Sequence, residues 1–155
     1  MDERARSFLV VIDGTPESSK ALRFAALRAA HTGATVKLLH ILEPTQFQQW
    51  GGVQEALEAE AEDEARAALA SEAAVVEEIL GQPPLLRIRK GHASDEVLAE
   101  LTEDRSVRAL VLAAAAKGRP GPLISFFSSE KAGALPCLVM IVPGGIDDAD
   151  LDRLT

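Results

Sequence analysis

The sequence predicts one α/β domain, a three-layer α/β/α sandwich around a five-stranded, mostly parallel, Rossmann-like sheet. Five apolar runs alternate with helix-like stretches along 155 residues, a length typical of one domain. Most runs are apolar at consecutive positions, as expected of strands that are covered on both faces. Right-handed crossovers between such strands give an open, doubly wound sheet, for which we expect the strand order 3-2-1-4-5. We expect the domain over residues 1–145 and an acidic C-terminal tail over 146–155.

The N-terminal part of the chain predicts a strand, a helix and a second strand. Residues 8–12 form a continuous apolar run, which is typical of a buried strand. Residues 15–17 (Thr-Pro-Glu) combine an N-cap residue, a proline at the first helical position and an acid in the first turn. This pattern favours a helix that runs to about Ala30, and Gly33 favours its end. The second strand is predicted over Val36–Leu42.

The middle of the chain predicts a loop over 45–52, which contains Phe47 and Trp50, and a long helix over 53–80. The apolar residues of this helix recur every three or four positions and define one packing stripe. They are Leu57, Ala61, Ala65, Ala68, Leu69, Ala73, Val76 and Leu80. Nine acids and one arginine share the same stretch. A carboxylate cluster can bind a metal, but no histidine or Asp-rich loop accompanies these acids, so we interpret them as a solvated helix face and expect no metal site.

The last part of the chain predicts three more strands. The first of them alternates Leu86 and Ile88 with Arg87 and Arg89, as an edge strand would. The predicted strands are Leu85–Arg89, Val107–Ala113 and Cys137–Val142, and the predicted helices are Asp95–Thr102 and Ser128–Ala134. A loop rich in glycine and proline is expected over 117–122, and the acidic tail is expected to be frayed.

Charge and composition argue against several classes of protein. The formal net charge is −8, from 16 basic and 24 acidic residues, whereas nucleic-acid binders usually carry a basic face. No apolar run approaches the ~20 residues that span a bilayer, and the charged N-terminal segment lacks a signal-peptide core. The single cysteine, Cys137, is expected to be an inert core thiol, and a reducing cytoplasm is the expected compartment.

The sequence lacks the common catalytic and phosphate-binding patterns. It has no G-x-x-x-x-G-K-[ST] loop and no G-x-G-x-x-G after the first strand. A phosphoacceptor receiver domain would need paired acids after the first strand and an aspartate after the third, but Ile12 precedes Asp13 and Lys90 follows the third strand. Of three histidines, two are expected at a helix end and in a strand. His92 lies in a loop at the functional edge without an evident partner, so we expect no catalytic residue.

Five segments, in the right order from Phe8 to Val142, resemble the universal stress protein family. They are Leu9–Ser18 (LVVIDGTPES), Leu38–Pro44 (LLHILEP), Gly91–Leu98 (GHASDEVL), Ser129–Lys131 (SEK) and Pro136–Val142 (PCLVMIV). The segment between the last two is one residue shorter than the family pattern, so a shortened fourth helix is expected. The resemblance also implies a homodimer, commonly formed through the last strand.

One branch of this family binds ATP through the motif G-x-x-G-(nine residues)-G-[ST] after the fourth strand, and the other branch lacks both. In the ungapped register the four motif positions are Ala113, Ala116, Phe126 and Phe127. A second register that starts at Gly118 and Gly121 fails, because Lys131 and Ala132 stand at its end. Glycines at such positions let backbone N–H groups approach phosphate with positive φ. An alanine there would cost roughly 1–2 kcal/mol, and we expect the Phe126 ring to occupy the phosphate space.

Two family adenine contacts are retained. Asp13 matches the acid after the first strand, and Ile41 matches a second-strand residue whose backbone faces adenine. Each also has a purely structural interpretation, since Asp13 can brace the turn and Ile41 can belong to the sheet core. Lys117 and Arg119 could attract an anion, but we interpret them as solvated loop charges.

The resemblance therefore implies a non-enzymatic stress-response protein that acts through dimerisation and protein contacts and does not bind ATP. No cofactor is expected, and the protein partner stays unidentified. The expected dimer interface is the wholly apolar last strand, which as an edge strand needs a cover. Its residues are Leu138, Val139, Met140, Ile141 and Val142. The alternative is a nucleotide-binding switch or weak ATPase with a remodelled loop, and an enzyme of the related adenine-nucleotide hydrolase folds is a third possibility.

Overall fold

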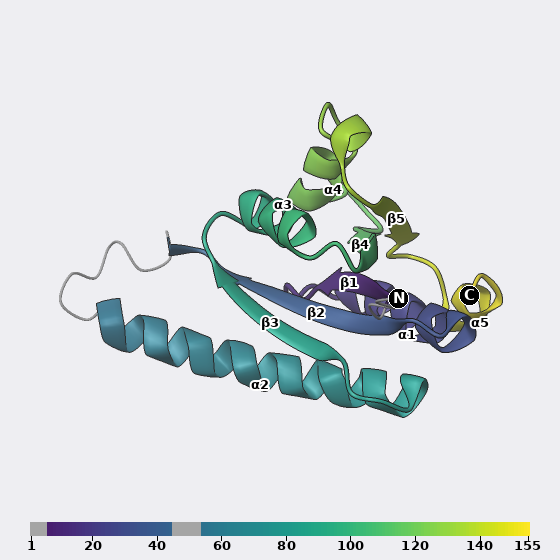
Figure 1. Ribbon diagram of the computed structural model, residues 1–155, viewed down its shortest axis with the longest axis horizontal. Coiled ribbons are helices and arrows are strands. Elements are labelled where there is room, and N and C mark those ends of the chain that lie inside the picture. Colours follow the sequence, from purple (N-terminus) through teal and green to yellow (C-terminus); the bar gives the residue numbers. More distant parts are fainter. Residues whose placement is uncertain (1–5, 45–53) are drawn as a thin grey trace.

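The computed structural model describes residues 6–44 and 54–155, and they form a five-stranded sheet (Figure 1). All four strand pairs are parallel, and the strand order is β3-β2-β1-β4-β5. The strands are β1 (Ser7–Val11), β2 (Thr35–Leu42), β3 (Leu85–Lys90), β4 (Val107–Ala114) and β5 (Leu138–Pro143). The predicted Rossmann-like sheet and its strand order are confirmed.

Helices cover both faces of the sheet, which confirms the three-layer sandwich. In Figure 1, α1, α2 and α5 lie on one side of the sheet, and α3 and α4 lie on the other. The helices are α1 (Ser18–Thr32), α2 (Gln54–Leu80), α3 (Ala93–Glu103), α4 (Pro122–Phe127) and α5 (Asp148–Arg153), with a 3₁₀ turn η3 at Ala132–Ala134. None of the helices within the described residues is long and apolar enough to cross a membrane.

The central strand β1 divides the core into two layers. Its side chains alternate between faces, so Phe8 and Val10 pack with α1 and α2, whereas Leu9 and Val11 pack with α3 and α4. Every residue of β1 is buried, since strands flank it on both sides and helices cover both faces. This explains why the first strand is a continuous apolar run in the sequence.

The long helix α2 follows its predicted stripe with one exception. Ala65, Leu69 and Val76 are buried against α1 and the sheet, but Ala68 is exposed. The period of 3.6 residues turns Ala68 away from the sheet when its neighbour Leu69 faces it. The predicted loop over 45–52 lies outside the described residues.

The prediction of a helix over 128–134 is wrong. The helix begins earlier, at Pro122, after Gly121, whose φ of 122° lies in the region that favours glycine. Pro122 occupies the first turn, and Ile124 and Phe127, three residues apart, bury the helix against the sheet. The glycine- and proline-rich stretch therefore includes a helix start, and only the short η3 turn lies in the predicted range.

The expectation of a frayed C-terminal tail is also wrong. Residues 148–153 form α5, whose start is capped by the Asp147 carboxylate, which accepts a hydrogen bond from the Asp150 N–H at 2.8 Å. Leu151 is 1% exposed and belongs to the core. Arg23 on α1 donates two hydrogen bonds, each 2.8 Å long, to the Asp152 carboxylate. One buried leucine and this bidentate ion pair hold α5 on α1.

The edge strand β3 is fixed by a buried ion-pair network that sequence inspection missed. Glu100 of α3 is 2% exposed, and its carboxylate lies 2.9 Å from Lys37 Nζ, 3.1 Å from Arg87 Nε and 3.3 Å from Arg89 Nη1. Lys37 also donates to Asp104 at 2.8 Å. These bonds connect α3 to β2 and β3. They explain the alternation of charged and apolar residues in β3, because Arg87 and Arg89 face α3 while Ile88 faces the opposite, apolar layer.

Candidate functional site

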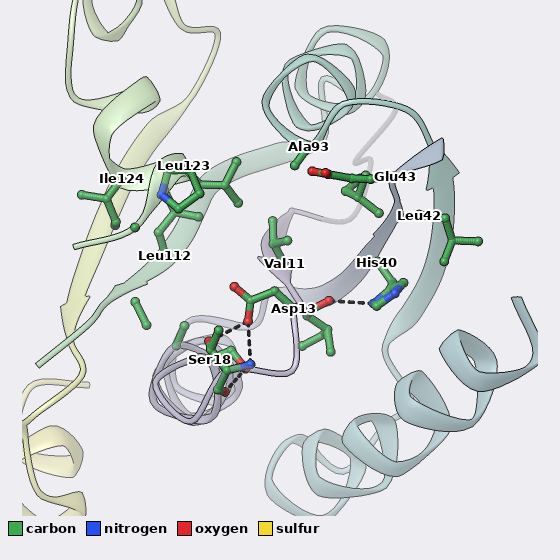
Figure 2. A pocket seen from close by; sticks show the side chains of 17 residues that line it. Val11, Asp13, Ser18, His40, Leu42, Glu43, Ala93, Leu112, Leu123 and Ile124 are labelled. Atoms are coloured by element: carbon green, nitrogen blue, oxygen red, sulfur yellow. Dashed lines mark hydrogen bonds between the residues drawn. The ribbon is translucent and has the colours of Figure 1, made fainter. Parts of the chain in front are cut away.

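A pocket lined by both polar and apolar side chains lies where strands end and helices begin. A pocket of about 320 Å³ opens beyond the carboxyl ends of β1, β2 and β4, beside the first turns of α1 and α4 (Figure 2). In an open parallel sheet this crevice, next to the central strand, is the usual place for a ligand. Its lining residues are Val11, Ile12, Asp13, Thr15, Ser18, Ala21, His40, Ile41, Leu42, Glu43, Ala93, Leu112, Ala113, Gly121, Pro122, Leu123 and Ile124.

Asp13 begins the turn between β1 and α1. One carboxylate oxygen, Oδ1, accepts hydrogen bonds from the Thr15 N–H at 3.0 Å and the Thr15 hydroxyl at 2.6 Å. The next residue, Gly14, has a φ of 77°, which suits glycine. The prediction that Thr15 caps the helix is therefore wrong, because its hydroxyl turns back to Asp13 and α1 begins only at Ser18. The other Asp13 oxygen makes no hydrogen bond within the described residues.

His40 and Glu43 add two more polar groups from the end of β2. The His40 Nδ1 lies 2.7 Å from the Ile12 carbonyl oxygen, so Nδ1 carries the proton and donates (Figure 2). The Glu43 side chain is half-buried, lines the pocket and has no hydrogen bond or ion pair within the described residues. Sequence inspection missed both as site residues, although their position at a strand end in a parallel sheet was a usable signal.

The loop after β4 bonds to itself instead of opening toward the pocket. The Ala115 N–H donates to the Pro120 carbonyl at 3.1 Å, and the Gly144 N–H donates to the Ala114 carbonyl at 2.7 Å. Among the described residues only glycines have positive φ, so Ala113 and Ala116 are not held in a left-handed conformation. The backbone thus follows a path that avoids the strain expected from an alanine at a glycine position.

The structure brings together only half of the predicted nucleotide-site residues. Asp13, Ile41 and Ala113 line the pocket, whereas Ala116, Phe126 and Phe127 do not. The Phe127 ring is 1% exposed in the core, and the Phe126 ring packs edge-to-face on it with centroids 4.9 Å apart. Both rings pack in the core layer between α4 and the sheet and not along this pocket, and the expectation that the Phe126 ring occupies the phosphate space stays a prediction.

The pocket is acidic. Asp13 and Glu43 line it, and no lysine or arginine does so among the residues that the structure describes. Lys117 and Arg119 are exposed on the loop after β4 and are not lining residues, as their interpretation as solvated charges predicts. Pro122, at the start of α4, has no N–H, so one of the helix's free backbone donors is missing.

The remaining histidines and the cysteine of the described residues lie apart from this pocket. His92 Nδ1 lies 3.0 Å from the Ser94 hydroxyl, and His31 Nδ1 lies 2.9 Å from the Thr155 backbone oxygen. Burial raises the pKa of the Cys137 thiol, which makes it a poor nucleophile. Within residues 6–44 and 54–155, no group of three or more His, Cys, Asp or Glu residues could hold a metal ion.

The predicted dimer strand lies at the opposite edge from β3. Leu138 and Ile141 are 67% and 45% exposed, Val139 and Met140 are half-buried, and Val142 is buried. β5 pairs with β4 on one side, and within the described residues no strand pairs with its other side. This edge therefore combines free backbone hydrogen-bonding groups with exposed apolar side chains.

Comparison with known proteins assigns the fold and the family. The family model described as the Universal stress protein family matches residues 5–143. The structure is similar to that of the universal stress protein UspA from Lactobacillus plantarum, with a TM-score of 0.73 and 17% identity over 91% of this chain and 99% of that one. No curated protein matches the chain in sequence.

Two further similar structures are universal stress proteins solved with a ligand. One, in complex with cAMP, has a TM-score of 0.67 and 16% identity, and covers 91% of this chain and 98% of its own. The other, from Archaeoglobus fulgidus in complex with dAMP, has a TM-score of 0.54 and 17% identity, and covers 90% and 97%. At these identities the likeness shows the fold alone.

Proposed function

The chain belongs to the universal stress protein family, and we propose that it acts there as a non-enzymatic homodimer that does not bind ATP. In this proposal the protein works through contacts with a protein partner, needs no cofactor and contacts neither nucleic acid nor a membrane. The expected place of action is the cytoplasm. Cell fractionation tests this last point, since recovery in an exported or membrane fraction would contradict it.

The charge of the pocket carries the argument against ATP. A triphosphate bears several negative charges, and proteins hold it with lysine, arginine, magnesium or a row of backbone N–H groups. Here the described lining residues include two carboxylates and neither a lysine nor an arginine. The loop after β4 uses its Ala115 N–H internally, and Pro122 has none. Repulsion between like charges in a partly enclosed pocket opposes binding.

Isothermal titration with MgATP tests this exclusion. We expect no saturable heat for the wild-type chain. Replacing Glu43 with lysine should then improve any residual binding, because the substitution turns repulsion into attraction, whereas Glu64→Lys on the exposed face of α2 should not. Micromolar binding of MgATP by the wild-type protein would overturn the proposal.

The free edge of the sheet supports the homodimer. Exposed leucine and isoleucine side chains on an unpaired strand are unusual in a monomer, because such an edge pairs with other chains. A second copy that covers β5 would satisfy both its backbone and its apolar side chains around a two-fold axis. Native mass spectrometry of the purified protein tests this, with a dimer expected and a monomer at all accessible concentrations contradicting it.

Nucleotide binding is the second candidate function. Asp13, Ile41 and Ala113 do converge on one pocket, and the N–H groups of Leu123 and Ile124 lie in the first turn of α4. The similar structures solved with cAMP and dAMP also favour it. Titration with each of these monophosphates separates the two candidates, since they carry less charge than ATP and should bind first if the pocket takes nucleotides.

A further inference from the structure

We propose that the pocket at the ends of β1, β2 and β4 binds a small organic cation, a ligand with an apolar body and an amine, amidinium or guanidinium group. The proposal rests on three properties of the pocket. Its side-chain donors are already used in hydrogen bonds within the protein, two of its carboxylates have no cationic partner within the described residues, and most of its wall is apolar. It does not depend on the dimer, and the oligomeric state of the protein does not enter its test.

The hydroxyl and imidazole groups that line the pocket already donate hydrogen bonds to other groups of the protein. The Thr15 hydroxyl donates to Asp13 at 2.6 Å, and the Ser18 hydroxyl donates to the Thr15 carbonyl at 2.9 Å. His40 uses its Nδ1 proton on the Ile12 carbonyl at 2.7 Å. The two hydroxyls leave lone pairs toward a ligand, together with those of the carboxylates. Apart from backbone N–H groups such as those of Leu123 and Ile124 in the first turn of α4, these polar groups call for a ligand that brings donors, as amines and amidines do.

Two carboxylates in the pocket have no cationic partner within the described residues. Asp13 uses one oxygen in the turn and keeps the other free, and Figure 2 shows it between the sheet end and the start of α1. Glu43 is half-buried, makes no hydrogen bond or ion pair within the described residues and extends from the end of β2. Asp13 is exposed, but the half-buried Glu43 carboxylate attracts a cation more strongly than the same charge on an open surface.

The rest of the wall is aliphatic. Val11, Leu42, Leu112, Leu123 and Ile124 come from three strands and from α4, and Figure 2 shows Val11 between Asp13 and Glu43. A volume of about 320 Å³ lies at the small end of ligand pockets, which suits a single ring or a short chain rather than a large cofactor. The apolar wall excludes simple metal cations as the preferred ligand, because these need a shell of oxygen ligands.

Three probes of matched shape test the charge requirement. Benzamidinium, benzamide and benzoate share a planar ring and differ in charge, and ¹H–¹⁵N correlation spectra of the full chain report both affinity and location. We expect saturable benzamidinium binding, with the largest shifts at Asp13, His40 and Glu43, at least about tenfold weaker binding of benzamide, and none of benzoate. Absence of saturable benzamidinium binding, or benzoate binding of equal strength, overturns the proposal.

Variants that each remove one carboxylate charge show which residues attract the benzamidinium ion. Asp13→Asn and Glu43→Gln keep shape and remove one charge, and each should weaken benzamidinium binding by about tenfold. Glu64→Gln, on the exposed face of α2, removes the same charge away from the pocket and should leave the affinity unchanged. Thermal unfolding of each variant checks the fold. Folded variants of Asp13 and Glu43 that bind benzamidinium like the wild type contradict the assignment of the site.

Discussion

The two edge strands of the sheet, β3 and β5, carry different kinds of side chains. At β3, Arg87 and Lys90 are exposed and Arg89 is partly buried, and an ion-pair network centred on Glu100 holds the strand to α3. At β5 no residue is charged, and Leu138 and Ile141 are exposed. Charged residues on an edge strand discourage pairing with other chains, whereas an apolar edge permits it. The contrast is that ion pairs to α3 and charged side chains mark one edge, which also exposes Leu85 and Leu86, whereas the other edge is wholly apolar.

Removal of the centre of the β3 network should have the largest effect. Glu100→Ala leaves Lys37 and Arg89 partly buried without their shared carboxylate, and we expect the free energy of unfolding to fall by about 3 kcal/mol. Urea unfolding monitored by circular dichroism measures it. Glu103, whose side chain is 58% exposed, is the matched control, and Glu103→Ala should cost far less. Equal losses for both would contradict the central role of Glu100.

A charge placed on the apolar edge should dissociate the dimer. Ile141→Lys removes an exposed isoleucine from both copies across the two-fold axis, and we expect a dissociation constant about 100-fold higher, or about 3 kcal/mol. Analytical ultracentrifugation measures the change. Leu85 on β3 is similarly exposed, at 59%, and Leu85→Lys should leave the association unchanged. Dissociation by Leu85→Lys instead would move the interface to the other edge.

The β3 side should also be the acid-sensitive one. Burial opposes the charge of Asp104, but hydrogen bonds from Lys37 and Ser106 dominate and hold the pKa at about 2, below its ordinary value of 3.8. Because the folded-state pKa is the lower one, this stabilisation is complete above about pH 4 and is lost as the pH falls toward 2. It amounts to about 2 kcal/mol. Asp104→Asn should flatten the pH dependence of unfolding in this window, and an unchanged profile would contradict the assignment.

The smallest effect is expected at the exposed rim of the network. Arg87 pairs with Glu100 at 3.1 Å, but its side chain is 49% exposed, so Arg87→Ala should cost less than about 1 kcal/mol. Thermal unfolding checks this value. A loss as large as that of Glu100→Ala would mean that the network depends on its exposed member.

Periodicity in the sequence predicts the parts of this fold that are set by burial. A continuous apolar run identifies β1, and mostly apolar runs identify β2 and β4, because helices cover both faces of these strands. The start of α4 was not predicted, because Gly121 and Pro122 are typical of loops. The helix begins there only because Ile124 and Phe127 are buried against the sheet. The formation of α5 also depends on long-range contacts, because the ion-pair partners of Asp148 and Asp152 lie on α1.

The candidate site was predicted only in part for a related reason. Asp13 and Ile41 match known contacts of the family motifs, whereas Glu43 stands in the same motif as Ile41 and is recognised as a pocket residue only from its place at the strand end. The direction of a side chain near a turn is likewise not encoded in spacing. Phe126 and Phe127 follow a plausible phosphate register, yet burial draws both rings beneath α4 and away from the pocket.

Hydrogen–deuterium exchange of the wild-type protein at two concentrations tests directly whether a second copy covers β5. Above the dissociation constant of the dimer, we expect added protection of amides in residues 138–143 and unchanged exchange in 85–90. Upon dilution the protection of β5 should disappear while that of β3 persists. Concentration-dependent protection in β3, with β5 exchanging equally fast at both concentrations, would contradict it.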